Sequence, residues 1–277
     1  MTTEVEPNAK FLDTSAPRSA ADWDVLLAHQ VDLIFPQELA ILLSLDAWRN
    51  ATRVLDAGCG NAYYLGKLQQ FFPDKDYSGV DISPQLIEVA ARRYPSIDFT
   101  ASDFLAYPAE PRFDLVIMRF LVQHLKDFGK VLEGVERVLR PGGRLLIIES
   151  DLSNSRHLPP LPVFTDMLLT FERAAAAKGG LKPRLLSDAA KLVRDSGRPW
   201  IVEEERIGTS PRIGPFLGSP LLAVYLLWVE LCERVGMFAF DFAAVREELN
   251  SWAANPATLS DVAMRMFVLT RDPAAQA

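Results

Sequence analysis

A chain of 277 residues with a formal net charge of −7 and a pI near 5.1 has room for one large α/β domain, or for a core with a smaller cap. Its acidic balance argues against a general nucleic-acid binder, because a surface that tracks phosphates needs clustered Lys and Arg. The two cysteines, Cys59 and Cys232, form no C-x-x-C pair, which argues against a disulfide framework or a zinc site and favours a reducing cytoplasm.

The first 45 residues are predicted to form an arm and lid helices. Residues 1–21 form the arm, and the apolar spacing of 23–35 predicts a helix that Asp22 caps. Pro36 should end this helix and leave 37–45 as a second one. Both helices precede the first strand, so they are placed to pack over the mouth of the turn that follows it.

No segment is predicted to span a membrane. The N-terminal region is polar and carries no apolar signal core. The most apolar run, 221–229, has only nine residues and is followed at once by Glu230. Such a run is too short to cross a bilayer.

Residues 46–150 alternate between short apolar strands and helices. The first strand ends at 53–55, and a glycine turn then leads into a helix at 62–72, for which Asn61 is the expected N-cap. Ser83-Pro84 and Asp127 mark two further helix starts. The other predicted strands are 77–82, 97–101, 113–118 and 144–148, and the other predicted helices are 85–93 and 128–139. This alternation implies right-handed crossovers and a parallel sheet.

From residue 151 onward the pattern changes to remaining strands with helical insertions. The insertions, at about 151–180 and 210–256, are expected to form a cap. The predicted elements are a link at 151–162, helices at 163–178 and 184–196, a strand at 200–207, a loop at 210–220, helices at 221–235 and 242–254, and a last strand at 262–270. The helix 221–235 is apolar nearly all round, so we expect it to be buried either in the cap or in a homodimer interface.

The glycine turn predicts a nucleoside site. Gly58 and Gly60 let a ligand approach the backbone, and the following helix offers free N–H groups. Asp81 ends the second strand, where an acid accepts both hydroxyls of a ribose. Dinucleotide enzymes share that role, so these signals alone fit two kinds of cofactor.

Three details disfavour a nicotinamide dinucleotide. The third glycine of the dinucleotide pattern would fall at Tyr63. Asp56 precedes the turn and is a poor neighbour for a pyrophosphate but a good one for an ammonium group. Asp103 follows the third strand, where it can accept a hydrogen bond from an adenine amine.

With these residues the chain resembles the class I S-adenosylmethionine-dependent methyltransferases, specifically the group that acts on small molecules. The resemblance covers roughly residues 50–150 and implies a Rossmann-like seven-stranded sheet, mostly parallel with an antiparallel last strand, and with helical cap insertions. The matching motifs are Val54-Leu-Asp-Ala-Gly-Cys-Gly60, Gly79-Val-Asp-Ile-Ser83, Ser102-Asp-Phe104, Phe113-Asp-Leu-Val-Ile117 and Leu139-Arg-Pro-Gly-Gly-Arg-Leu145.

The resemblance implies S-adenosylmethionine as the cofactor and assigns residues to its methionine end. Gly58 and Gly60 let the methionine part approach, Asp56 holds its amino group, and Arg119 lies beside it. The third glycine usual in the family is Ala62 here. This departure concerns the closeness of approach and not the fold.

The resemblance assigns other residues to the nucleoside end of the cofactor. Asp81 takes the ribose hydroxyls, with Ile82 beside it in the same motif. Asp103 and Phe104 are expected to line the adenine pocket. The alternative for Asp103 is a plain turn residue whose side chain binds its own backbone.

His124 is the sharpest catalytic candidate, because it follows the fourth strand near the place where the transferred methyl group would point. It could take a proton from a hydroxyl or ammonium nucleophile. The alternative is a structural histidine that ties the loop to the backbone. Glu149 and Asp151 could act as a base or a substrate anchor, although a structural role is favoured for both.

The acceptor is expected to be a small, apolar or aromatic metabolite, in keeping with secondary metabolism. Signatures of macromolecular substrates are missing, since Arg119-Phe-Leu-Val-Gln-His124 replaces the Asn/Asp-Pro-Pro-Tyr loop of amino methyltransferases. The segments outside the core supply aromatic and Met side chains suited to such a ligand. They are Trp23, Phe164, Met167, Phe171, Phe216, Tyr225, Trp228, Met237, Phe238, Phe240 and Phe242.

Alternatives remain open for the reaction. A non-methylating enzyme of the same fold, such as a cyclase, or a cofactor-binding protein would keep the same motifs. A protein or RNA methyltransferase is a further alternative. The sequence does not predict a metal site, a nucleic-acid partner or a membrane partner.

Overall fold

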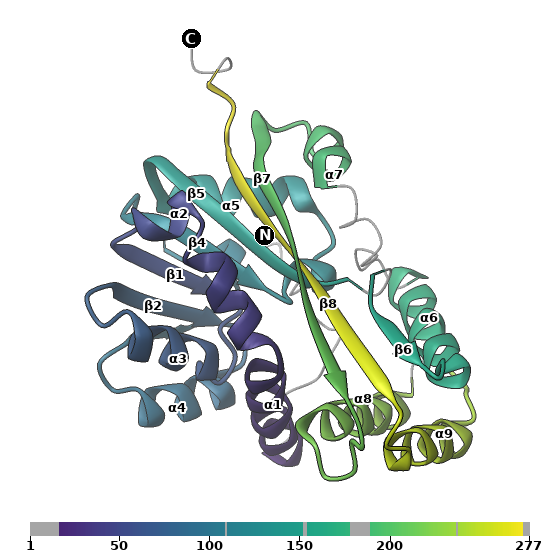
Figure 1. The fold of residues 1–277 in the computed structure, drawn as a ribbon. Helices are drawn as coiled ribbons and strands as arrows, with labels where there is room; N and C mark the ends of the chain where they lie inside the picture. The colour runs from purple at the N-terminus through teal and green to yellow at the C-terminus, as the bar shows by residue number, and fades with distance from the viewer. Residues whose placement is uncertain (1–16, 109, 152–153, 178–188, 237, 274–277) are drawn as a thin grey trace, which may run out of the picture.

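The structure, a computed structural model, describes residues 17–108, 110–151, 154–177, 189–236 and 238–273 (Figure 1). Its centre is an eight-stranded sheet in which β8 runs antiparallel to β5, β6 and β7, while β1 to β5 are parallel. The strands are β1 (Arg53–Ala57), β2 (Asp76–Asp81), β3 (Asp98–Ala101), β4 (Phe113–Arg119), β5 (Leu139–Ser150), β6 (Arg156–Leu158), β7 (Trp200–Ile213) and β8 (Leu259–Arg271). The predicted mostly parallel, Rossmann-like sheet with an antiparallel last strand is confirmed.

The strand order explains why the predicted site lies at the carboxyl ends of the central strands. The order β3-β2-β1-β4-β5-β8 puts β1 between β2 and β4, so the chain reverses its direction of growth at β1. In open α/β sheets ligands bind beyond the carboxyl ends of the strands at such a switch point. β7 pairs with β8 on the side away from β5, and β6 is an additional short strand that pairs with β8 beyond the end of β5.

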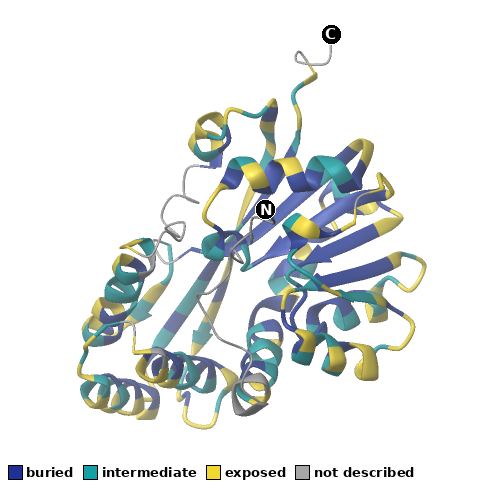
Figure 2. Ribbon diagram, turned by 180° about the vertical axis from the view of Figure 1, so that it is seen from behind, coloured by how far each residue is buried: buried dark blue, intermediate teal, exposed yellow. Residues whose placement is uncertain are grey.

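Alternating side chains of the central strands feed two hydrophobic cores, one on each face. Leu115 and Ile117 of β4 join one cluster, whereas Val116 and Met118 join the other. The continuous apolar run that predicted this strand is therefore explained by burial on both faces. Figure 2 shows these central strands buried beneath helices whose outer faces are exposed.

Helices cover both faces and extend into a cap at one end of the sheet (Figure 1). The α-helices are α1 (Pro17–Leu42), α2 (Asp46–Arg49), α3 (Tyr63–Phe71), α4 (Pro84–Arg93), α5 (Phe128–Val138), α6 (Pro162–Ala177), α7 (Ala189–Asp195), α8 (Pro220–Val235) and α9 (Phe242–Ala254), with short 3₁₀ helices η1 (Phe104–Ala106) and η2 (Val122–His124). The first core contains side chains from α1, α6, α8 and α9, so lid, cap and sheet share one apolar interior. The apolar side chains of α8 are largely buried within this chain.

The predicted break at Pro36 is wrong, because α1 runs through it as one helix. A proline inside a helix removes one backbone hydrogen bond and costs about 3 kcal/mol. Here Leu33, Ile34 and Phe35 before it are buried, and Glu38 and Leu42 after it are buried too. The side chains of both halves therefore pack on the same core, and this packing outweighs the local cost.

The segment Ala21–Leu42 of α1 is, within the described residues, long and apolar enough to cross a membrane by length and composition. The prediction of no membrane span was based on the run 221–229 and not on this segment. In this structure Trp23, Leu26 and Leu42 are part of the first core. Core helices of compact domains meet the same criterion of length and composition, so the finding is weak evidence for a membrane span.

The predicted helix N-caps at Ser83 and Asp127 are confirmed, and the one at Asn61 is wrong. Ser83 and Asp127 cap α4 and α5, because their side chains accept from the N–H groups of Leu86 and Lys130. The N-cap position of α3 is Ala62 rather than Asn61. Two strands also exceed their predicted bounds, since β7 continues through 210–213, predicted as loop, and β6 lies inside the predicted link 151–162. In both cases pairing with β8 supplies the backbone partners.

Candidate functional site

One cavity of about 330 Å³ opens beyond the carboxyl ends of β1, β2 and β4 and continues between α1, α6 and α8. Predicted site residues gather at its strand end, which is lined by Asp56, Gly58, Cys59, Gly60, Asn61, Asp81, Ile82, Arg119, Phe120, Leu121, Gln123 and His124. Its other end is lined mostly by apolar side chains of the lid and cap. The cavity thus joins a polar region at the sheet to an apolar chamber.

The glycine turn adopts the backbone that its sequence predicts. Gly58 and Gly60 have φ angles of +79° and +55°, in the left-handed region where glycine carries no steric penalty. A Cβ on Gly58 would lie 2.9 Å from Leu121 Cδ1, and one on Gly60 would lie 2.7 Å from Leu27 Cδ1. The turn is held to β2, because the N–H of Gly58 donates to the carbonyl of Val80 over 2.7 Å.

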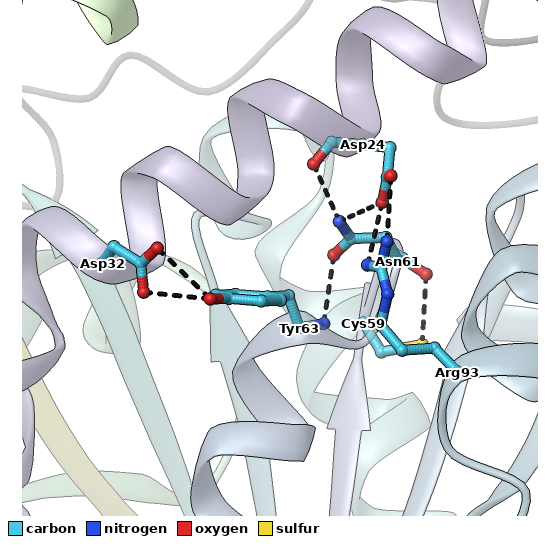
Figure 3. A network of polar contacts seen from close by, with 7 residues as sticks. Asp24, Asp32, Cys59, Asn61, Tyr63 and Arg93 are labelled. Carbon is cyan, nitrogen blue, oxygen red and sulfur yellow. Dashed lines mark hydrogen bonds and ion pairs between the residues drawn. The ribbon is translucent and has the colours of Figure 1, made fainter. Parts of the chain in front are cut away.

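Asn61 ties this turn to the lid helix α1. Its Nδ2 donates to Asp24 Oδ1 over 2.7 Å and to the Asp24 carbonyl over 3.0 Å, and its Oδ1 accepts from the N–H of Tyr63 over 3.1 Å (Figure 3). Arg93 of α4 donates to both carboxylate oxygens of Asp24, over 2.9 and 3.0 Å. Asp32, two turns farther along α1, accepts from the Tyr63 hydroxyl. The lid is thus clamped over the turn by polar contacts.

Asp81 braces the same turn from β2. Its Oδ2 accepts from the N–H of Gly60 over 2.9 Å, and its Oδ1 accepts from the N–H of Ser83 over 2.8 Å. Each carboxylate oxygen has a second lone pair, so both oxygens remain able to accept from ribose hydroxyls. Ile82 is exposed beside it and lines the cavity.

Arg119 and Asp56 form the polar floor of the cavity, and Glu38 of α1 contacts Arg119 from outside the cavity lining. The Nε of Arg119 donates to Glu38 Oε1 over 2.8 Å, and both side chains are almost completely buried. The guanidinium lies against the rings of Tyr64 and Phe120, at 4.8 and 4.4 Å from their centroids. Glu38 was not among the predicted site residues, because its only signal in the sequence is an acid within an apolar helical stripe.

Three atoms of these residues are buried without a hydrogen-bond partner among the described residues. They are Asp56 Oδ1, Glu38 Oε2 and Arg119 Nη2. Buried polar atoms normally have partners, so the orphaned atoms of the two lining residues, Asp56 and Arg119, point to a ligand that carries complementary charges. The ammonium and carboxylate groups of a methionine moiety are such charges. This cradle of orphaned atoms and glycine therefore fits S-adenosylmethionine.

Burial raises the pKa of Asp56 to about 7. The positive charge of Arg119 opposes this rise, whereas the carboxyl groups of Asp81 and Glu38 add to it. Near neutral pH the Asp56 carboxyl of the free site is therefore protonated in part of the molecules and ionised in the rest. A cationic ligand group would favour the carboxylate form.

Phe120 has a φ angle of +54°, which is a rare conformation for a bulky residue. Its N–H donates to the Ile148 carbonyl over 2.8 Å, so the strain is held by the end of β5. Such strain concentrates at functional sites. Here it turns the chain directly after Arg119 and leads into η2, which carries His124.

His124 lines the cavity, and burial lowers the pKa of its ring to about 4. The ring is therefore neutral near pH 7 and has a nitrogen lone pair. Glu149 does not line the cavity; it accepts from the N–H of Gln123 over 3.4 Å and so supports η2. Asp151 pairs with Arg265 Nε over 2.5 Å, which is a structural contact. Within the described ranges, no three His, Cys, Asp or Glu side chains converge as a metal-binding group.

Asp103 and Phe104 lie apart from the cavity lining. Asp103 Oδ1 accepts from the N–H of Leu105 over 2.9 Å and caps η1, which is the turn role considered as its alternative. Phe104 is buried in the second core. Their contact with adenine stays a prediction.

Only some of the aromatic and Met side chains that were predicted to contact the acceptor line the apolar chamber. Trp23, Phe164, Phe171, Tyr225 and Trp228 line it. Trp228 packs edge-on against both Trp23 and Phe171, with ring centroids 6.5 and 5.7 Å apart. Met167, Phe216, Phe238, Phe240 and Phe242 do not line it, and Met237 lies outside the described residues.

A family model described as a methyltransferase domain matches residues 49–179. Similar curated proteins include a demethylmenaquinone methyltransferase of Renibacterium salmoninarum, 30% identical over 159 residues, or 54% of this chain and 65% of that protein. An O-methyltransferase of Penicillium expansum is 28% identical over 192 residues, or 65% of this chain and 68% of that protein. The chain spans 65%, 49% and 42% of the lengths of three such relatives.

Solved structures with a similar fold include two methyltransferase complexes. One is an O-methyltransferase from neocarzinostatin biosynthesis with S-adenosylmethionine and a naphthoic acid bound; it is 18% identical, covers 69% of this chain and 55% of its own, and has a TM-score of 0.53. The other is a phosphoethanolamine N-methyltransferase of Haemonchus contortus with S-adenosylhomocysteine; it is 18% identical, covers 94% and 58%, and has a TM-score of 0.53. At this identity the likeness concerns the fold. The matched residues 49–179 contain every strand-end residue of the site but not α1 or α8.

Proposed function

Because this chain carries a class I S-adenosylmethionine-dependent methyltransferase domain, we propose that the protein transfers the methyl group of S-adenosylmethionine to an O, N or C atom of a small, apolar or aromatic metabolite. One observation carries the proposal. The orphaned atoms of Asp56 and Arg119 lie in the same cavity as the aromatic chamber, so a charged donor and an apolar acceptor can share it.

The methionine and ribose parts of the donor each have a matching part of the cavity. Asp56 Oδ1 would accept from the ammonium group and Arg119 Nη2 would donate to the carboxylate, while Gly58 and Gly60 leave room for the chain between them. Asp81 would accept from the ribose hydroxyls. When bound, the cofactor supplies an activated methyl group on a positively charged sulfur.

The protein's contribution to the rate is mainly positioning. Methyl transfer needs the nucleophile in line with the methyl group and the sulfur, and holding two reactants in this geometry replaces a bimolecular step. A base is needed only for an acceptor that must lose a proton. His124, neutral in this site, is the residue we propose for that task.

The lining of the chamber, and not the similarity to other proteins, supports an apolar or aromatic acceptor. The similar curated proteins are named for demethylmenaquinone, trans-aconitate and a malonyl carrier protein, which differ in charge and size. Aromatic walls from α1, α6 and α8 favour a flat, apolar ligand. We further propose a role in secondary metabolism in the cytoplasm, without a nucleic-acid or membrane partner.

Two measurements test the proposal. Calorimetric titration with S-adenosylhomocysteine should show binding to the wild-type protein and much weaker binding to Asp56→Asn. The control Asp76→Asn, at the exposed start of β2, should bind as the wild type does. Absence of binding to the wild type would refute the donor site.

Incubation with S-adenosylmethionine and a metabolite extract should then yield a product heavier by one methyl group. Cofactor binding without any methylated product would instead favour a non-methylating enzyme of the same fold. For His124→Ala we expect nearly unchanged cofactor affinity and turnover lower by about two orders of magnitude. Unchanged turnover would return His124 to a structural role.

A further inference from the structure

Three polar side chains meet at the outer end of the chamber, away from the strand ends that hold the donor site. His157 of β6 faces Ser260 of β8 in the register of that strand pair, and Tyr225 comes from α8. Ser150, the last residue of β5, pairs with Met264. Ser260 is four positions before Met264 in β8, so the cluster lies about 13 Å beyond the end of β5 at about 3.3 Å per residue.

Hydrogen bonds and packing hold His157 in place. Its Nδ1 lies 3.1 Å from Ser260 Oγ, and its Nε2 lies 3.4 Å from the Tyr225 hydroxyl. The ring packs edge-on against Tyr225 and Trp252, with centroids 5.7 and 5.6 Å away. Trp252 is anchored in turn, because its Nε1 donates to the Pro159 carbonyl over 3.1 Å. His157 and Tyr225 line the cavity, whereas Ser260 is fully buried behind them.

The cluster is uncharged near neutral pH. Burial lowers the pKa of His157 to about 4, and burial raises the pKa of Tyr225 well above its ordinary value. The guanidinium of Arg212, whose charge acts on the Tyr225 hydroxyl, donates to Ser210 Oγ and to the Leu33 carbonyl. The lining side chains at this end, His157 and Tyr225, are therefore neutral, and the charge of Asp261 acts on His157 from outside the lining.

We propose that the Tyr225 hydroxyl, positioned by His157 and Ser260, accepts a hydrogen bond from a neutral hydroxyl group of a ring-bearing acceptor and so determines acceptor specificity. The Tyr225 hydroxyl also bonds the Ser260 side chain. Neutral His157, Ser260 and Tyr225 each carry one polar hydrogen, and the three contacts among them use all three, so the position left on the Tyr225 hydroxyl is an acceptor. The ring of Phe164, whose centroid is 4.6 Å from that of Tyr225, supplies an apolar wall next to this group. This inference rests on the proposed function, because it concerns the acceptor end of the same cavity.

The test compares four probes of equal ring size on the protein saturated with S-adenosylhomocysteine. They are 2-naphthol, its isostere 2-methylnaphthalene, the anion 2-naphthoate and the cation 2-naphthylmethylammonium. The wild type should bind 2-naphthol most tightly. In Tyr225→Phe the dissociation constant for 2-naphthol should rise about three- to tenfold, which is the effect of one neutral hydrogen bond, while that for 2-methylnaphthalene should change less than twofold.

Two further variants separate recognition from general destabilisation. Tyr77→Phe also loses a hydroxyl, the one that donates to the Phe72 carbonyl over 3.1 Å, but it does not line the cavity and should bind every probe as the wild type does. His157→Phe keeps a ring but removes the partner of the hydroxyl, so it should also weaken 2-naphthol more than 2-methylnaphthalene. Equal weakening of both probes by Tyr225→Phe would overturn the inference. Preference of the wild type for either ion, or no binding of 2-naphthol, would overturn it too. Failure of S-adenosylhomocysteine to bind would instead refute the proposed donor site.

Discussion

The Nε of Arg119 donates to Oε1 of Glu38 over 2.8 Å, although the two residues are 81 positions apart and both side chains are inside the protein. One comes from the end of β4 and the other from the lid helix α1. Burying two charges is costly, and their attraction offsets that cost only with good geometry. The second oxygen of Glu38 and Nη2 of Arg119 have no hydrogen-bond partner among the described residues. The pair therefore links the lid to the floor of the donor site.

Removing one partner of this pair should destabilise the fold strongly. In Glu38→Ala the Arg119 guanidinium stays buried without its counter-charge, and we expect a loss of about 3–5 kcal/mol in the free energy of unfolding. Urea unfolding followed by circular dichroism measures it. The exposed pair between Asp195 and Lys191 provides the control, because Asp195→Ala should cost less than about 1 kcal/mol. Equal losses in both variants would contradict the role assigned to Glu38.

The parts of the site that local sequence could predict are those set by neighbouring residues. Gly58 and Gly60 were predictable because a strand that turns at once into a helix requires left-handed backbone there. Asp81 was predictable because it ends a strand next to that turn. The apolar run before Arg119 likewise indicated a strand buried on both faces.

The parts that escaped prediction depend on partners distant in the chain. Glu38 has no local reason to be buried, and its partner Arg119 belongs to another element. Asn61 Oδ1 accepts from the N–H of Tyr63 at the start of α3, but its Nδ2 also binds Asp24 of the lid, 37 residues earlier, which no local signal indicated. The uninterrupted α1 at Pro36 likewise depends on packing that no local rule contains. Pairing of this kind becomes visible only when the fold brings the elements together.

Cofactor affinity should depend on pH through Asp56. The pKa of its carboxyl is about 7 in the free site, and only the carboxylate attracts an ammonium group. Binding of S-adenosylhomocysteine should therefore strengthen as the pH rises from 5.5 and level off above about 7, with about a tenfold change per pH unit on the acid side. Calorimetry across this range checks the slope. Asp56→Asn should bind weakly with no such slope, and a wild-type affinity that is flat with pH would contradict the assignment.

The clamp between lid and turn should control how fast the cofactor leaves. Asp24→Ala removes the carboxylate that accepts from both Asn61 and Arg93 and leaves only the bond from Asn61 to the backbone carbonyl of residue 24, so α1 should open more often. We expect faster amide hydrogen exchange in α1 and faster dissociation of S-adenosylhomocysteine, about two- to tenfold, as suits a partly exposed charged contact. Stopped-flow displacement measures the rate.

Asp32→Ala is the matched control for this clamp. Asp32 also lies on α1, but it contacts Tyr63 and Lys67 of helix α3 and not the glycine turn. Its removal should change the dissociation rate less than removal of Asp24 does. If both variants increased the dissociation rate of S-adenosylhomocysteine equally, the lid would respond to any lost contact. That result would contradict the specific role of Asp24.

Glu149 should make the fold less stable as the pH rises. Burial raises the pKa of its carboxyl to about 8, against the backbone N–H bonds from Gln123 and Val122 and the charge of Arg119. Because the folded pKa exceeds the unfolded one, the folded state binds the extra proton between about pH 4.5 and 8. The stabilising contribution of the protonated form is thus complete at low pH and is lost as the pH rises through this window.

Glu149→Gln isolates that effect, because an amide resembles the protonated acid and can still accept from the N–H of Gln123. Near pH 5 the variant and the wild type should unfold at nearly the same temperature. Above pH 8 the variant should unfold at a higher temperature, since only the wild type must then bury a carboxylate whose second oxygen has no partner among the described residues. Thermal unfolding at both pH values tests the sign. If Glu149→Gln were less stable than the wild type at pH 8.5, the carboxylate would be supporting η2 in its charged form, and the raised pKa would be wrong.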